Sequence, residues 1–279
     1  MVGKDTVKTE TFEERRQKYK RILKDLTIMS DVFMRNVFKK QECTEYVLKV
    51  ILGKKELRII DQVLEMDYKN LQGRSAVFDC VARDSEGKLT NVEIQQDNEG
   101  ASPKRARYHS GLLDMNTLNP GQDFDKLPES YVIFITKRDI LGYGLPIYHI
   151  DRKIREADEE FRDGAHIIYV NSRKQENTEL GRLMHDLNCK NAKDMYNKIL
   201  ADRVYELKET PEGVEYMCRE MEQLYSEGME SGIEWGELKK AKKTALSMAR
   251  DGMEIEKIAR YVEVSTEKVK EWIEEDLVK

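Results

Sequence analysis

The hydrophobic residues of this chain follow the helical period at both ends and a period of two in between. Apolar positions recur every three or four residues over residues 31–38 and 44–52, which predicts two helices, with Gly53 as a suitable stop for the second. Residues 1–30 are mostly polar and are interpreted as a helical lead-in. The period then changes to that of β-strands. The predicted strands cover residues 57–68, 75–83, 90–96, 131–136 and 166–170.

The links between these strands indicate how they are connected. The polar, glycine-containing segment 84–88 predicts a hairpin between the second and third strands. Pro103 is typical of the first turn of a helix, so a helix is predicted over residues 104–116, before the fourth strand. The order is helix, three-strand meander, helix and strand. The predicted fold class is therefore α/β.

After residue 175 the pattern is helical. Residues 180–207 have helical periodicity, and Thr210 with Pro211 is typical of the start of another helix. Glycines then recur at every fourth position, at Gly228, Gly232 and Gly236. Because each glycine in a helix costs roughly 1 kcal/mol, we interpret this stripe as a flexible joint. The alternative is close packing against a neighbouring helix.

The last segment predicts a small helical module. Helices are predicted over residues 238–249 and 255–261, and Ser265 is a suitable N-cap for a third, an arrangement similar to a helix-turn-helix. Four lysines precede it, but the third helix is rich in glutamate, whereas helices that read DNA are usually basic. We favour a packing or oligomerisation role over DNA reading. The predicted domains are 1–30 (lead-in), 31–175 (core), 176–237 (helical extension) and 238–279 (module).

Composition narrows the class of protein. The chain has 279 residues, of which 39% are hydrophobic and 36% charged, enough for one sizeable core and a smaller domain. Its net charge of −5 argues against a general polyanion binder, so contact with nucleic acid would need local basic clusters or metal ions. The four cysteines form no CxxC pair, which argues against a disulfide framework or structural zinc and favours a reducing, cytoplasmic location. We expect no signal peptide and no membrane span.

Two acidic residues lie inside apolar strand patterns. Asp79 and Glu93 are each seven residues from Glu86, so a hairpin centred there places them directly opposite, with Cβ atoms roughly 5 Å apart. Gln95 follows Glu93 by two positions and shares its face. The opposite face would then supply core residues, namely Phe78, Cys80, Val92 and Ile94.

Two carboxylates that face each other destabilise a bare sheet unless a cation lies between them. Oxygen ligands of this kind favour Mg²⁺, for which Mn²⁺ can substitute. The alternative is that Asp79 and Glu93 lie on the solvent face of a half-exposed sheet, although Val77 and Val81 on that face make it less than wholly polar.

These residues resemble the PD-(D/E)XK nuclease superfamily, in the form D-x(n)-E-x-Q, and more specifically the PD-(D/E)XK nuclease family transposases, the Rpn-type recombination-promoting nucleases. The resemblance implies a restriction-endonuclease-like core and a DNA endonuclease linked to recombination or mobile DNA. Asp79 and Glu93 match the metal-binding carboxylates, and Gln95 matches the usual lysine position. Asp31 matches an acidic position near the start of the pattern, where it is either an outer metal ligand or a helix cap.

Basic residues follow the third strand. Lys104, Arg105 and Arg107 gather at the start of the predicted helix and, with Tyr108, are candidates for contact with the DNA backbone. The alternative is a solvated helix face with Tyr108 in the core. The four histidines share no ligand spacing and are interpreted as structural or surface residues.

The leading hypothesis is a Mg²⁺-dependent deoxyribonuclease, with DNA as partner and a homodimer as a possible assembly for cutting both strands. The second hypothesis is a nuclease fold with weak or no catalysis that binds DNA or protein, because Gln95 brings hydrogen bonds but no positive charge. The third is a helix-turn-helix regulator whose large domain is a platform for partners.

Overall fold

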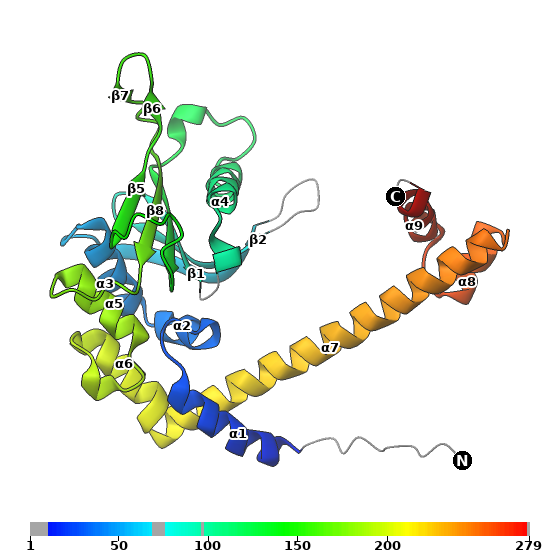
Figure 1. Ribbon diagram of the computed structural model, residues 1–279, viewed down its shortest axis with the longest axis horizontal. Coiled ribbons are helices and arrows are strands. Elements are labelled where there is room, and N and C mark those ends of the chain that lie inside the picture. Colours follow the sequence, from blue (N-terminus) through cyan, green and yellow to red (C-terminus); the bar gives the residue numbers. More distant parts are fainter. Residues whose placement is uncertain (1–10, 69–75, 96–97, 278–279) are drawn as a thin grey trace. The chain divides into compact units, whose positions relative to one another are not determined.

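The computed structural model describes residues 11–68, 76–95 and 98–277 and divides into two compact units, Met1–Cys218 and Arg219–Lys279 (Figure 1). The predicted domain limits at 30, 175 and 237 stay predictions, and the division falls inside the predicted helical extension. None of the helices in the described part of the chain is long and apolar enough to cross a membrane.

The first unit is built on a six-stranded sheet with the order β1-β2-β3-β4-β8-β5. β1, β2 and β3 form an antiparallel meander, β4 and β8 run parallel to β3, and β5 is an antiparallel edge strand. The predicted α/β class is confirmed, and all five predicted strands are present. The bounds are Ile59–Tyr68 (β1), Ala76–Asp84 (β2), Leu89–Gln95 (β3), Ser130–Thr136 (β4), Ile147–Ile150 (β5) and Ala165–Asn171 (β8).

Sequence patterning missed three short strands. β5 has four residues, and β6 (Lys153–Ile154) pairs with β7 (Glu159–Glu160) in a separate ribbon. All four residues of the ribbon are exposed, so no apolar alternation marks them. β4, by contrast, is buried along its whole length, as expected for a central strand paired in parallel on both sides.

Helices cover both faces of the sheet (Figure 1). α4 (Pro103–Met115) packs on β4 and β8, and its Ala106 shares a buried cluster with Val132 and Phe134. The start of α4 is as predicted, with Pro103 in the first turn, and Ser102 is its N-cap. The other face is covered by α2 (Asp31–Phe38) and α3 (Gln41–Leu52), and a single turn, η1 (Asn98–Ala101), leads from β3 toward α4.

The helical extension of the first unit consists of α5 (Glu179–Asn188) and α6 (Lys198–Glu209), and the lead-in forms α1 (Phe12–Asp25). The predicted helical stretch 180–207 is thus two helices. Asp186 explains the break, because its fully buried carboxylate accepts the backbone N–H groups of Tyr196 and Asn197, both at 2.8 Å. Two further single turns are η2 (Phe124–Lys126) and η3 (Ala192–Asp194).

A single helix, α7 (Pro211–Arg250), continues without a break through Gly228, Gly232 and Gly236. The helix predicted to begin at Leu238 is therefore the last part of α7, and the predicted joint is not an interruption of secondary structure. A Cβ atom added at any of the three glycines would meet no atom within 4 Å, so close packing does not account for them in the described part of the chain.

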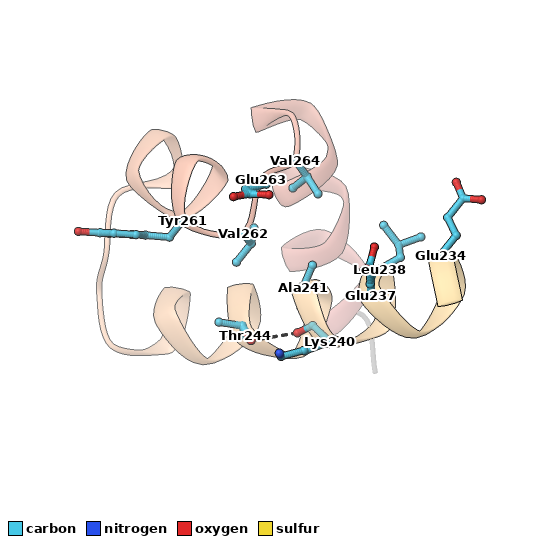
Figure 2. Close-up of a pocket in the computed structure, with 10 residues that line it drawn as sticks. All are labelled: Glu234, Glu237, Leu238, Lys240, Ala241, Thr244, Tyr261, Val262, Glu263 and Val264. Carbon is cyan, nitrogen blue, oxygen red and sulfur yellow. Dashed lines mark hydrogen bonds between the residues drawn. The ribbon is translucent and has the colours of Figure 1, made fainter. Parts of the chain in front are cut away.

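In the second unit, α8 (Ile255–Tyr261) and α9 (Thr266–Leu277) pack on the end of α7. Ser265 caps α9 as predicted, since its hydroxyl accepts the backbone N–H of Lys268 at 3.2 Å. Figure 2 shows a groove that α7 forms with the turn between α8 and α9, lined by Leu238, Ala241, Tyr261 and Val264 among others. The core of this unit consists of Ala245, Ile258, Ala259, Val269 and Trp272.

Candidate active site

The pairing of β2 with β3 ends just before the two predicted carboxylates, and we call this open end of the hairpin the fork. The antiparallel pairs run from Arg83–Leu89 to Cys80–Val92, which places the centre of the hairpin at Glu86 as predicted. Asp79 and Glu93 are the next residues, where the ladder between the two strands ends. β3 stays paired with β4 as far as Gln95. The mouth of the fork is therefore formed by Asp79 on one strand and Glu93 on the other.

Each carboxylate bonds to the backbone of the opposite strand. Oε1 of Glu93 accepts the backbone N–H of Asp79 at 3.4 Å, and Oδ2 of Asp79 accepts the backbone N–H of Ile94 at 3.0 Å. Oε1 of Glu93 also accepts a hydrogen bond of 3.0 Å from the side-chain amide of Asn91. These bonds replace the ladder beyond Cys80–Val92 and hold the two carboxylates next to each other.

The alternation of side chains between the two faces of β2 breaks at Asp79, so the prediction that Phe78 and Cys80 share one face is wrong. Phe78 and Cys80 are both buried, as predicted, but they face different neighbours. Phe78 shares a cluster with Leu112 and Leu113 of α4, whereas Cys80 hydrogen-bonds to Thr44 of α3. The break coincides with an irregularity on β1, where Glu65, between the partners of Phe78 and Cys80, has a left-handed φ of 54°.

The two carboxylates lie in different surroundings. Glu93 is fully buried and faces α4, where a guanidinium nitrogen of Arg105 is 3.8 Å from Oε2 and Nδ1 of His109 is 3.5 Å from Oε1. Asp79 is partly buried. Burial raises the pKa of Asp79 from 3.8 to about 7, and the neighbouring carboxylates of Glu93 and Asp31 act in the same direction.

The donor set fits a divalent metal ion. Oε2 of Glu93 is buried and has no hydrogen-bond partner within the described residues, an unfavourable state for a carboxylate oxygen. Asp79 offers a second carboxylate beside it. Oxygen donors of this kind suit Mg²⁺ or Mn²⁺, whose charge would offset the burial and the repulsion by Glu93 that raise the pKa of Asp79. Asp79 and Glu93 could therefore hold a cation together.

Gln95 lies on the face of β3 that Glu93 occupies, two positions further along. Its side chain rests against the backbone of η1, because a Cβ atom on Gly100 would lie 1.8 Å from Oε1 of Gln95. A glycine at position 100 therefore leaves the space that the Gln95 amide fills. Gln95 is only partly buried, so the amide can also reach a ligand.

Asp31 is near the two carboxylates but is not the cap of its helix. Ser30 occupies the N-cap position of α2, and Asp31 is the first helical residue. Its carboxylate pairs with Arg35 at 2.8 Å, and Arg35 also pairs with Glu65. Because Asp31 contributes to the raised pKa of Asp79, it lies within electrostatic reach, and its role as an outer ligand stays a prediction.

The predicted DNA-binding residues of α4 separate into two groups. Arg105 reaches Glu93, while Lys104 and Arg107 are exposed to solvent. Tyr108 is partly buried and packs against the cluster around Phe78, which favours the core alternative for this residue.

Sequence reasoning missed two residues that contact Glu93. Asn91 precedes Glu93 by two positions and so shares its face, a signal that was available in the strand pattern. His109 follows Arg105 by one helical turn, but its approach to Glu93 depends on the packing of α4 against the sheet.

A second group of possible metal ligands lies on α5. Side-chain atoms of His185, Asp186 and Cys189 lie within 4.8 Å of one another. Both carboxylate oxygens of Asp186 already accept backbone N–H groups. This carboxylate therefore has a complete structural role, and we base no metal site on the group.

Comparison with known protein families gives a match over more than half of the chain. No curated protein and no solved structure matches the chain. Residues 46–228, more than half of the chain, match the sequence model of the PD-(D/E)XK nuclease family transposases. The matched segment contains Asp79, Glu93 and Gln95 as well as α4. The chain belongs to the PD-(D/E)XK nuclease family transposases.

Proposed function

We propose that this protein is a metal-dependent DNA endonuclease that hydrolyses phosphodiester bonds in connection with recombination or mobile DNA. One observation carries the proposal. Asp79 and Glu93 converge at the fork of β2 and β3, and Oε2 of Glu93 is a buried oxygen without a hydrogen-bond partner within the described residues. Family membership supports the class of reaction.

Each residue would have a distinct part in hydrolysis. Asp79 and Glu93 would hold Mg²⁺, with Mn²⁺ as a substitute. When bound, the metal would lower the pKa of a water molecule and offset negative charge on the leaving oxygen. The Gln95 amide would hydrogen-bond to the attacking water or to a phosphate oxygen. Because an amide lacks the positive charge of a lysine, Gln95 would stabilise the transition state less.

DNA is the substrate that the basic residues favour. Lys104 and Arg107 are exposed near the N-terminus of α4, and Arg105 of the same helix contacts Glu93. A helix N-terminus with cationic side chains is suited to a phosphate group. A net charge of −5 would confine contact with the DNA backbone to such local clusters. A homodimer and a cytoplasmic location remain parts of this proposal.

The test is cleavage of supercoiled plasmid with Mg²⁺, with Mn²⁺ or with EDTA. The native chain is compared with Asp79→Ala, Glu93→Ala and the control Asp61→Ala, which changes an exposed acidic residue of β1. We expect metal-dependent nicking in the native chain and in the control, and none in the other two variants. Absence of cleavage with every metal, while all four proteins bind DNA, would contradict the proposed endonuclease activity.

Gln95 favours a second candidate function, a nuclease fold that binds DNA with little or no catalysis. Replacing Gln95 with lysine distinguishes the two. An enzyme limited by its amide should cleave faster as Gln95→Lys, whereas a binding module should bind DNA and cleave with neither residue.

A further inference from the structure

His109 is the most confined polar side chain near the two carboxylates. Its side chain is 1% exposed and lies between two aromatic rings. The ring centroids are 4.6 Å apart for the stacked pair with Phe78 and 5.8 Å apart for the tilted pair with Phe134. Packing therefore fixes the orientation of the imidazole. Nε2 has a hydrogen-bond partner, whereas Nδ1 is buried and has none among the described residues, its contact with Glu93 being 3.5 Å long.

The neighbour of Nε2 determines which nitrogen carries the proton of a neutral imidazole. Nε of Arg105 donates a hydrogen bond to Nε2 of His109 at 3.2 Å. A guanidinium group only donates, so Nε2 acts as the acceptor and carries no proton. The proton of the neutral ring is then on Nδ1, which lies 3.5 Å from Oε1 of Glu93.

The two oxygens of Glu93 differ in a way that this orientation explains. Oε1 receives the backbone N–H of Asp79 and the Asn91 amide, and Nδ1 of His109 lies on the same side. Oε2 receives no hydrogen bond from the described residues. Donors thus collect on Oε1, whereas Oε2 has only the longer contact of 3.8 Å with the guanidinium of Arg105 and keeps its capacity to accept a cation.

We propose that His109 is a positioning residue of the metal site, which directs its Nδ1–H to Oε1 of Glu93 so that Oε2 stays available for a divalent cation. The inference rests on the proposed function because it requires Glu93 as a metal ligand. Arg105 fixes the tautomer of His109 through Nε2, and a second guanidinium nitrogen lies 3.8 Å from Oε2 of Glu93. Loss of a group that orients a metal ligand typically lowers metal affinity about 10- to 100-fold.

Three substitutions separate the effect of the Nδ1–H donor from that of the packing. His109→Phe keeps an aromatic ring between Phe78 and Phe134 but removes the donor. His109→Gln also lacks a donor at the Nδ1 position and serves as the second variant in case the phenylalanine disturbs folding. His109→Asn places an amide near the Nδ1 position and is the conservative rescue. Met115→Gln, at an exposed position of α4, is the matched control.

The experiment is titration calorimetry of the full-length protein with Mn²⁺, which needs no cleavage activity. We expect His109→Phe and His109→Gln to bind Mn²⁺ about 10- to 100-fold more weakly than the native chain, with most of the affinity restored in His109→Asn. Thermal unfolding without metal serves as the check on folding. A purely structural histidine would change the unfolding temperature and leave the Mn²⁺ affinity of the folded protein unchanged.

The outcomes separate this inference from the proposed function. If the native chain binds Mn²⁺ and Glu93→Ala does not, the metal site stands. Native affinity in both His109→Phe and His109→Gln would then overturn the role of His109 alone. If the native chain and Glu93→Ala bind Mn²⁺ equally, or neither binds, Glu93 is not a ligand and both proposals fail together.

Discussion

In the first unit, two carboxylates on adjacent strands each accept a backbone N–H of the opposite strand, whereas in the second unit acidic side chains lie on helix surfaces beside basic ones. Glu93 is fully buried and Asp79 partly so. In the second unit, Asp276 pairs with Arg250 at 2.7 Å and Glu271 pairs with Lys268 at 2.8 Å, both at the surface. Exposed pairs contribute little to stability, while converging buried carboxylates need a compensating charge.

This difference between the acidic residues of the two units indicates where a functional site can be expected. A surface charge is compatible with almost any function because water solvates it. A buried pair of like charges destabilises the fold, so its presence favours a ligand that the fold accommodates. By this argument the proposed metal site belongs to the first unit, whereas the second unit has a small apolar core around Trp272.

The largest expected effect comes from disrupting the second unit alone. Trp272→Ala removes a core side chain that is 3% exposed and should destabilise this unit by about 3–5 kcal/mol. Hydrogen exchange should show lost protection in α8 and α9, while Mn²⁺ binding measured by calorimetry stays unchanged. Loss of Mn²⁺ binding in Trp272→Ala would break the comparison, because the site would then depend on the second unit.

The next effect is a pH dependence confined to the first unit. The pKa of Asp79 is raised from 3.8 to about 7, so between these values the folded protein binds more protons than the unfolded chain. The stability of the metal-free protein should therefore fall as pH rises from about 4 to about 7. Asp79→Asn should remove this part of the pH dependence.

Hydrogen exchange of β3 and β4 at pH 5 and pH 7.5, in EDTA, measures this dependence. Both tryptophans of the chain lie in the second unit, so their fluorescence during urea unfolding is an internal control that should lack the Asp79 contribution. Equal protection of β3 at both pH values in the native chain and in Asp79→Asn would contradict the prediction.

A feature of the site can be predicted from the sequence when its physical cause is local in the chain. The convergence of Asp79 and Glu93 follows from a hairpin centred on Glu86, and the observed register has this centre. The break in alternation at Asp79 was not predictable, because it coincides with the left-handed backbone of Glu65 on a different strand. The approach of His109 to Glu93 likewise depends on the docking of α4 against the sheet.

The helices show the same distinction. Ser102 with Pro103 and Ser265 mark helix starts through short-range hydrogen bonds and a fixed φ, and those starts were predicted within a residue or two. The continuity of α7 through its glycines was missed, because a cost of roughly 1 kcal/mol per glycine does not end a long helix in which every added residue gains a hydrogen bond.

A smaller effect is expected at the contact between Gln95 and η1. A Cβ atom in Gly100→Ala would lie 1.8 Å from Oε1 of Gln95 and must displace this side chain, which is free to rotate. The fold should persist, and the rate of plasmid cleavage should fall about 10- to 100-fold, toward that of Gln95→Ala. Gly111→Ala on α4 is the matched control, since its added Cβ meets no atom within 4 Å. Native cleavage by Gly100→Ala would mean that the position of Gln95 is irrelevant to the reaction.

The smallest effect tests α7, where the chain passes from one unit to the other. A Cβ atom at Gly232 meets no neighbour within 4 Å, and the residue is helical, so Gly232→Ala should stabilise the helix by about 0.5–1 kcal/mol. Gly252→Ala is the opposing control, because Gly252 has a φ of 78° and alanine there should be destabilising. Urea unfolding followed by tryptophan fluorescence compares the three proteins.

A stabilised Gly232→Ala protein that cleaves plasmid at the native rate would show that the reaction needs no flexibility at this position. A stabilised protein with slower cleavage would support a functional joint within a continuous helix. The loss of bending at Gly232 would then be the difference between the native protein and the variant.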